Sequence, residues 1–274
     1  MFFLLLASVT LAADEPGPWF ESLTAGGVQP GALIQSLSVE YRAPVLRYGG
    51  AVFNDTFVGG GARASVTPAF SEFAGRVSAQ PIDILPITFE AVHTAYFNNN
   101  VGLVAMDSLD NGSRFPERLS RIEQGFGFGG SSLTLSASPT LQMRVGPIVG
   151  FTNWTFASIQ VRQPDGIDTE YVFDPFRGIV IAWDDWIIEH TSAVLYERTV
   201  GAKNGLLRIG PATRGRWSLN GPDETLTLGG LVQYRPTDTP YMPTFMLLTS
   251  SFLKDPDFLG PVPNVLVAVT FNNQ

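Results

Sequence analysis

The stretch Ser131–Gly150, SSLTLSASPTLQMRVGPIVG, alternates apolar and polar side chains. Leu133, Leu135 and Leu141 share one phase of this alternation, and Arg144 belongs to the other. A period of two residues places alternate side chains on opposite faces of a β-strand, so the stretch predicts an amphipathic strand. The fold then depends on which face meets water. The apolar face packs on a core in a soluble sandwich, but it faces lipid in a membrane barrel.

Two residue types refine the prediction for this stretch. Gly146 and Pro147 predict a tight turn into a following strand. Pro139 has no N–H to donate to the ladder, so we expect a bulge or a local gap at that position.

The same alternation recurs along the chain of 274 residues, whereas helical periodicity is nowhere sustained. Turn residues separate about 12 such segments, each near the roughly 10 residues that a tilted membrane strand requires. One long connection, Asn98–Gly130, interrupts the pattern, and we expect it to face outside or to fold into the barrel. The alternating segments include Ala32–Arg42, Thr56–Thr67, Ile87–Ala91, Leu207–Arg214, Leu226–Arg235 and Asn264–Phe271.

The composition argues against an ordinary soluble surface. Charged residues make up 15% of the chain, compared with about 25% in typical soluble domains. The polar phases carry Ser, Thr, Gln and Arg, and the chain has only two lysines, Lys203 and Lys254. A net charge of −8 argues against a nucleic-acid partner. Because there is no cysteine, disulfides, thiolate metal sites and cysteine nucleophiles are excluded.

The first residues have the features of a secretory signal. Phe2–Val9 is a short apolar run, and the small residues Thr10, Ala12 and Ala13 follow it. The run is too short to cross a bilayer as a helix, which takes about 20 residues. We therefore expect a signal peptide over residues 1–13 and a single barrel domain over residues 14–274.

Together, the signal-like start, the alternating strands and the terminal stretch VLVAVTF resemble bacterial outer-membrane β-barrel proteins. The resemblance implies an all-β, closed, antiparallel transmembrane barrel of about 12 strands that is located in the outer membrane among its lipids. Aromatic residues near the expected strand ends fit the girdles of such barrels. They are Trp19, Phe20, Tyr41, Phe57, Tyr96, Phe97, Tyr171, Phe173, Trp183, Trp186, Tyr196, Trp217, Tyr234, Tyr241 and Phe271. The chain departs from the class after Phe271, because three polar residues replace the aromatic end that often helps assembly.

Charged residues in the polar phases are expected to converge on the barrel interior. They would either line a narrow channel for small solutes or ions, or form a salt-bridge network that plugs a structural or surface protein. Neither interpretation needs a cofactor or a metal ion. The predicted lumen-lining residues are Glu40, Arg42, Arg63, Arg76, Glu90, Arg144, Arg208 and Arg214.

A catalytic alternative centres on His190 and Ser192, which are two residues apart and share a strand face. With Asn204, they resemble the His, Ser and Asn pattern of outer-membrane phospholipase A, which would make Ser192 the nucleophile, His190 the base and Asn204 its orienting partner. A hairpin turn at Thr199–Asn204 would separate Asn204 from His190 by about 30 Å, too far for a hydrogen bond. In that case His190 is a lumen or interface residue.

A soluble secreted β-barrel binding module is the third hypothesis. Such a protein would bury the apolar phase of its strands in a core and expose the polar phase to water. In the membrane barrel, His93 has the phase of Phe89 and Ala91, so we expect an interfacial histidine on the lipid side near a strand end.

Overall fold

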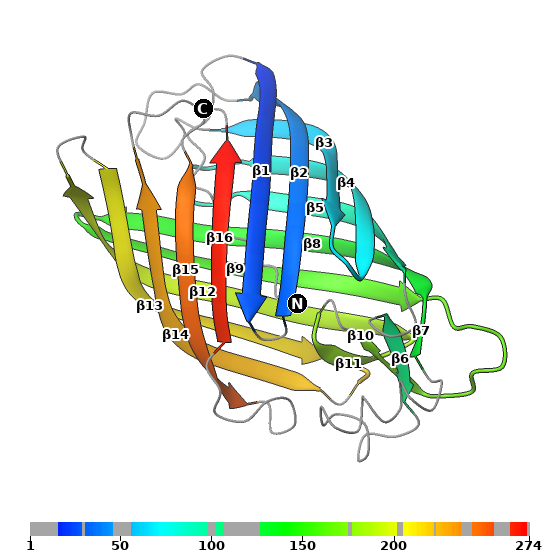
Figure 1. Ribbon diagram of the computed structural model, residues 1–274. Helices are drawn as coiled ribbons and strands as arrows, with labels where there is room; N and C mark the ends of the chain where they lie inside the picture. The colour runs from blue at the N-terminus through cyan, green and yellow to red at the C-terminus, as the bar shows by residue number, and fades with distance from the viewer. Residues whose placement is uncertain are drawn as a thin grey trace.

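The computed structural model describes residues 16–28, 31–45, 56–97, 102–106, 127–174, 177–201, 205–221, 223–236, 243–254 and 264–272. Within these ranges, the protein is built from strands, and no helix is long and apolar enough to cross a bilayer. Twelve strands close into one antiparallel barrel, and four short strands form a separate sheet (Figure 1). The predicted fold class is confirmed. The expected signal peptide, residues 1–13, lies outside the described residues.

The barrel follows chain order except where the small sheet interrupts it. Neighbouring strands are antiparallel, and β1 pairs with β16 to close the ring, with Ser22 opposite Phe271. The barrel strands are β1 (Gly17–Val28), β2 (Gly31–Pro44), β3 (Phe57–Val66), β4 (Phe70–Gln80), β5 (Ile87–Tyr96), β8 (Gly130–Val145), β9 (Ile148–Val161), β12 (Asp184–Val200), β13 (Gly205–Ser218), β14 (Glu224–Arg235), β15 (Thr244–Lys254) and β16 (Asn264–Asn272).

The opening stretch forms β8, the turn that follows it and the start of β9. Leu133 and Leu135 are exposed on the outer face, whereas Thr134 between them is buried on the inner face. Gly146 makes the tight turn with a positive φ of 58°. The pairing between β8 and β9 skips Pro139 without a change of register, so the proline leaves a gap rather than a bulge.

Apolar side chains cover the outside of the barrel. Since the closed sheet pairs its backbone groups with neighbouring strands, it can expose these side chains to lipid. The phase predicted to face lipid is therefore the outer one. Exposed apolar residues on it include Leu37, Val39, Val58, Phe73, Val77, Phe89, Leu133, Leu135, Leu141, Met143, Val194, Ile209, Leu228, Leu247 and Val267.

The prediction for the aromatic residues is correct for some positions and wrong for others. Phe20, Tyr41, Tyr196, Tyr234, Phe271 and Trp186 are exposed on the outer face near strand ends. Trp19, Phe57 and Tyr96 instead point inward and are buried. Phe173, Tyr171 and Trp183 pack on or within the small sheet. Sequence position near a strand end does not distinguish these groups, because the face depends on the phase of each strand. Tyr241 lies outside the described residues.

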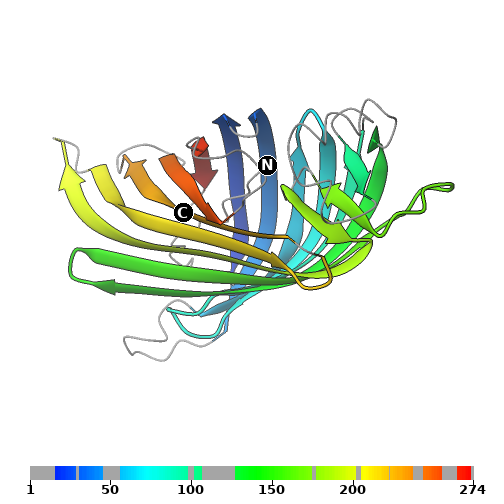
Figure 2. The same ribbon diagram turned by 90° about the horizontal axis from the view of Figure 1, so that it is seen from below.

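The small sheet has the strand order β11 (Ile179–Ala182), β10 (Tyr171–Asp174), β6 (Leu103–Met106) and β7 (Gly127–Phe128). Its strands come from the β5–β8 and β9–β12 connections, which emerge at the same end of the barrel (Figures 1 and 2). We call this end of the barrel the sheet end. The opposite end, which carries the β8–β9 turn, is called the turn end. The small sheet includes parts of the predicted long connection Asn98–Gly130; residues 98–101 and 107–126 lie outside the described residues.

Gly61 allows β2 and β3 to approach closely. A Cβ at this position would lie 2.0 Å from the backbone oxygen of Val39, which cannot move without shifting β2. Gly75, on neighbouring β4, has open space where a Cβ would be. The two glycines therefore provide a matched test of this contact.

We expect Gly61→Ala to destabilise the folded barrel by roughly 1–3 kcal/mol, as overpacking against fixed neighbours does. The measurement is a urea titration of refolded protein, with folded and unfolded forms separated by their gel mobility before heating. Gly75→Ala should have the same urea midpoint of unfolding as the wild-type protein. Equal midpoints for the two variants would contradict the close contact.

Candidate functional site

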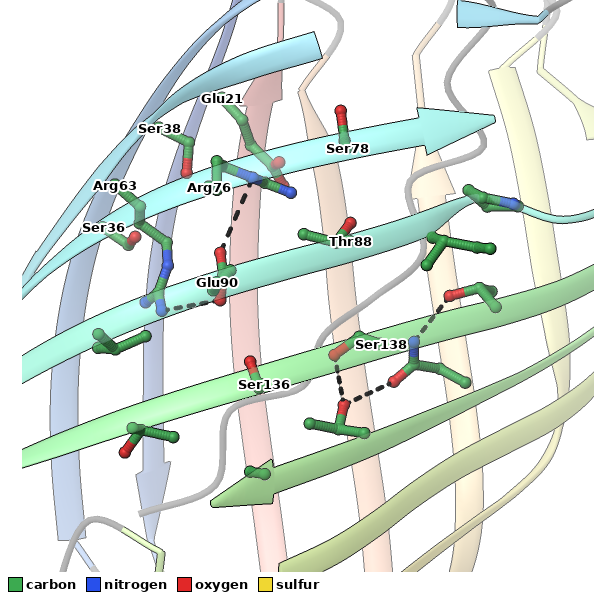
Figure 3. A pocket seen from close by; sticks show the side chains of 18 of the residues that line it. Glu21, Ser36, Ser38, Arg63, Arg76, Ser78, Thr88, Glu90, Ser136 and Ser138 are labelled. Atoms are coloured by element: carbon green, nitrogen blue, oxygen red, sulfur yellow. Dashed lines mark hydrogen bonds and ion pairs between the residues drawn. The ribbon is translucent and has the colours of Figure 1, made fainter. Parts of the chain in front are cut away.

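A cavity of about 220 Å³ lies inside the barrel, between the small sheet and the turn end. Side chains from the inner faces of β1–β5, β8, β9, β12 and β16 line it, together with Arg177 from the small sheet. Figure 3 shows charged side chains of β3, β4 and β5 next to hydroxyl groups of β8. The cavity is therefore the place where the polar phases of the strands meet.

Charges on β3, β4 and β5 form a connected network along one wall. Arg63 bridges Glu72 at 3.0 Å and Glu90 at 3.3 Å. Arg76 lies 3.8 Å from Glu90, its direct partner in the β4–β5 register. Thr94 donates a further hydrogen bond to Glu72. Opposite charges on adjacent inward positions thus neutralise one another within the wall.

Glu40 and Arg42 form a buried ion pair nearer the turn end. Glu40 is fully buried, and its carboxylate accepts hydrogen bonds from Arg42 at 3.0 Å and from Ser78. The guanidinium of Arg42 also lies over the rings of Trp19, at 4.0 Å, and Phe57, at 4.5 Å. These contacts hold Arg42 against the wall and explain why both aromatic rings face inward.

Glu189 carries the charge of the opposite wall, on β12. It accepts a hydrogen bond from Arg216 at 2.6 Å and lies 3.7 Å from Arg214. Glu189 lines the cavity, whereas the two arginines lie on the inner face of β13 outside the cavity lining.

Glu197 holds two arginines near the turn end. Arg208 lies 2.7 Å from it, and Arg144 approaches it at the same distance. Arg144 is 65% exposed, so it belongs to the rim of the barrel rather than to the cavity.

Hydroxyl and amide groups of β8 and β9 supply the uncharged part of the lining. Ser138 and Thr155 share a hydrogen bond of 2.8 Å, and Asn153 donates to Thr140 at 2.7 Å. These pairs connect side chains on neighbouring strands. They leave this wall polar but without charge.

Arg177 brings a charge from the small sheet to the cavity. Its guanidinium bonds Asp174 at 2.5 Å and Thr134 of β8 at 2.9 Å. Burial alone would lower the pKa of Arg177, but the adjacent Asp174 outweighs burial and raises this pKa above its ordinary value. The residue therefore stays charged at the boundary between the small sheet and the cavity.

The structure brings Arg42, Arg63, Arg76 and Glu90 together in the cavity lining, with Glu40 directly behind it. The cavity lining also contains four charged residues that are absent from the predicted set: Glu21, Glu72, Glu189 and Arg177. Glu72 and Glu189 have the same inward phase as their neighbours, so alternation could have identified them. Within the described part of the chain, no group of three or more His, Cys, Asp or Glu residues could hold a metal ion.

His190 and Ser192 lie on the outer face of β12, away from the cavity. The Nε2 atom of His190 is 3.3 Å from Thr213 on β13, whereas Ser192 donates to Thr152 on β9 at 2.7 Å. The two side chains therefore engage strands on opposite sides of β12. His93 also lies on the outer face, where it is exposed.

The third residue of the hypothesis, Asn204, lies outside the described residues. Its neighbour Gly205 pairs with Val200, ten residues along β12 from His190, or about 33 Å. The His190 ring instead stacks between Trp154 and Trp217, with ring centroids 5.1 Å and 5.4 Å away.

Loss of the Glu40 charge should be costly, because Arg42 would remain buried beside an uncharged partner. We expect Glu40→Gln to lower the free energy of unfolding by about 3–5 kcal/mol, measured by urea titration. Glu224→Gln is the control, because Glu224 pairs with Lys254 where both are exposed, and should cost at most about 1 kcal/mol. A similar loss in both variants would contradict a specific role for the buried pair.

Comparisons with known proteins reach only the level of overall shape. No protein-family model matches the sequence, and no curated protein matches it. The β domain of the Bordetella autotransporter Brka is similar, with a TM-score of 0.49, 8% identity, and coverage of 94% of this chain and 99% of that chain. The translocator domain of the autotransporter NalP from Neisseria meningitidis has a TM-score of 0.45 and 9% identity, over 96% of this chain and 90% of its own. OmpT, an outer membrane protein of Vibrio cholerae, has a TM-score of 0.38 and 7% identity, with coverage of 94% and 97%.

The class of this chain therefore rests on its own geometry. A closed antiparallel sheet of twelve strands exposes an apolar outer surface, and its charges are gathered inside. A soluble binding module would bury the apolar phase that this barrel exposes. The protein is a β-barrel of the transmembrane type, with an outer surface suited to lipid.

Proposed function

We propose that the protein is a narrow solute channel that is held closed at its sheet end by the small sheet. The observation that carries this proposal is the lining of the cavity, which is charged along its walls and reaches Arg177 of the small sheet. Charged groups that line a passage through a barrel determine which solutes enter it. A plugged structural or surface protein is the competing function.

Apolar packing accounts for the closure. Leu103, Ile179 and Ile181 of the small sheet are fully buried, and they belong to one hydrophobic cluster with the inner face of the barrel wall. The wall contributes Phe70, Tyr96, Ala157, Ile159, Val161 and Ile187 to this cluster, all near the sheet end. Contacts of this kind stabilise the closed state without covalent attachment.

Hydrogen bonds attach the small sheet to the barrel. Arg177 donates to Thr134, the Val180 N–H donates to Asp223 at 3.0 Å, and the Ala182 N–H donates to Asp185 at 3.1 Å. A unit that forms its own ladder can open locally while the barrel stays folded.

The lipid hydrolase receives no support from the arrangement of its residues. Ser192 and His190 bond to different neighbouring strands, and Glu189 and Glu197 point to the inner face. A base that does not contact its nucleophile lacks the geometry that activates a serine.

The channel function predicts that weakening the attachment of the small sheet increases opening. Thr134→Val removes the hydrogen bond from Arg177 to β8 but leaves the Arg177–Asp174 pair intact. A net loss of about 1 kcal/mol would raise the open-to-closed ratio about fivefold. Single-channel recording in planar bilayers measures this ratio directly.

Thr227→Val is the control, because Thr227 is buried on the inner face of β14 and bonds the backbone oxygen of Arg214 in the barrel wall. Its open fraction should equal that of the wild-type protein. Folded protein that gives no conductance steps in any variant would favour the plugged structural barrel instead.

A further inference from the structure

The charges that line the cavity are balanced in sign. Among the described residues, four arginines and four glutamates contribute to the lining: Arg42, Arg63, Arg76, Arg177, Glu21, Glu72, Glu90 and Glu189. A lining with an excess of one sign would concentrate ions of the opposite sign. A balanced lining gives no such preference, so the solute must be recognised by groups that remain available within the cavity.

Glu21 and Arg76 are the two lining charges with the fewest contacts. No hydrogen bond or ion pair within 4.0 Å joins Glu21 to any other described residue. Arg76 has one ion pair, at 3.8 Å, and its buried Nε atom has no hydrogen-bond partner in the described part of the chain. Figure 3 shows the two side chains pointing toward each other, from β1 and β4.

Incomplete pairing is unfavourable for charges that have been removed from bulk water. A buried charge without hydrogen-bond partners has lost its hydration without replacement. A solute that carries an anionic and a cationic group would give each of the two residues a partner of opposite charge. A solute with only one charge would pair with one of these residues and leave the other without an added partner.

Apolar side chains also line the cavity. Leu23, Ala157 and Ile187 line the cavity and also belong to the hydrophobic cluster under the small sheet. Leu23 follows Glu21 by two residues on the same inner face of β1. The cavity therefore offers a carboxylate and a guanidinium, with the apolar side chain of Leu23 beside the carboxylate.

We propose that this cavity binds a small zwitterion with an apolar side group. The carboxylate of the solute bonds Arg76, its ammonium bonds Glu21, and its side group packs on Leu23. A volume of about 220 Å³ fits a solute the size of an amino acid, because pockets for drug-sized ligands measure roughly 300–1,000 Å³. The inference deepens the proposed function, and it rests on the channel for the route by which the solute passes.

The test measures binding at equilibrium, so it does not depend on conductance. Full-length protein refolded in detergent is titrated by calorimetry with L-leucine, with leucinamide and with isocaproate. Leucinamide lacks the carboxylate, and isocaproate lacks the ammonium group. Since each charge-assisted contact is lost in one of the analogues, L-leucine should bind at least roughly tenfold more tightly than either.

The variants assign each group of the solute to its residue. Arg76→Gln should remove the preference for L-leucine over leucinamide, and Glu21→Gln should remove the preference over isocaproate. Arg198→Gln is the matched control, because Arg198 is exposed on the outer face of β12, and it should bind L-leucine like the wild type. Gel mobility before heating establishes that each variant is folded.

Equal binding of the three compounds, or no binding of L-leucine by folded protein, would overturn the zwitterion site. These outcomes are separate from failure of the channel. Selective binding of L-leucine without conductance would refute the channel and support the site. Conductance without selective binding would support the channel and refute the zwitterion site.

Discussion

The requirement that every backbone N–H and C=O group be paired inside lipid governs the rest of the structure. An open sheet leaves two unpaired edges, and the bilayer core offers no water to satisfy them. The pairing of β1 with β16 removes both edges. Once the ring is closed, the strands can expose leucine, valine and phenylalanine on the outside at no cost in backbone hydrogen bonding. Their alternate side chains must then point into the barrel.

A second constraint concerns the interior of the barrel, where charged side chains lie close together in a confined space. Most of the inward arginines and glutamates form pairs between adjacent strands, such as Arg63 with Glu72, or along a single strand, such as Arg42 with Glu40. Apolar inner residues gather at the sheet end, where they pack on the small sheet. The resulting cavity has paired walls, an apolar boundary and two residues, Glu21 and Arg76, that are less completely paired than the rest.

The fold could be predicted from the sequence wherever one strand face is apolar and the other polar. This applies to β8, in which Leu133 and Thr134 take opposite faces as expected. It fails for β1, where Trp19 and Leu23 point inward while Ser22 and Thr24 lie in the outer phase. Because both faces of β1 mix apolar and polar side chains, neither the inward Trp19 nor the inward Glu21 could be recognised. Arg177 was missed for a different reason: its place at the cavity depends on tertiary packing of the small sheet, which has no local sequence signal.

The pairing of β1 with β16 also affects the order in which the barrel can fold. It joins Glu21 to Asn272, residues separated by almost the whole length of the described chain. Contacts between such distant residues form slowly, because the chain must lose most of its conformational freedom before they stabilise anything. Until the final strand arrives, the other strands present two free edges and an apolar face. The ring therefore cannot close before β16 has been synthesised, and until then the edges and the apolar face are open to contacts with other chains.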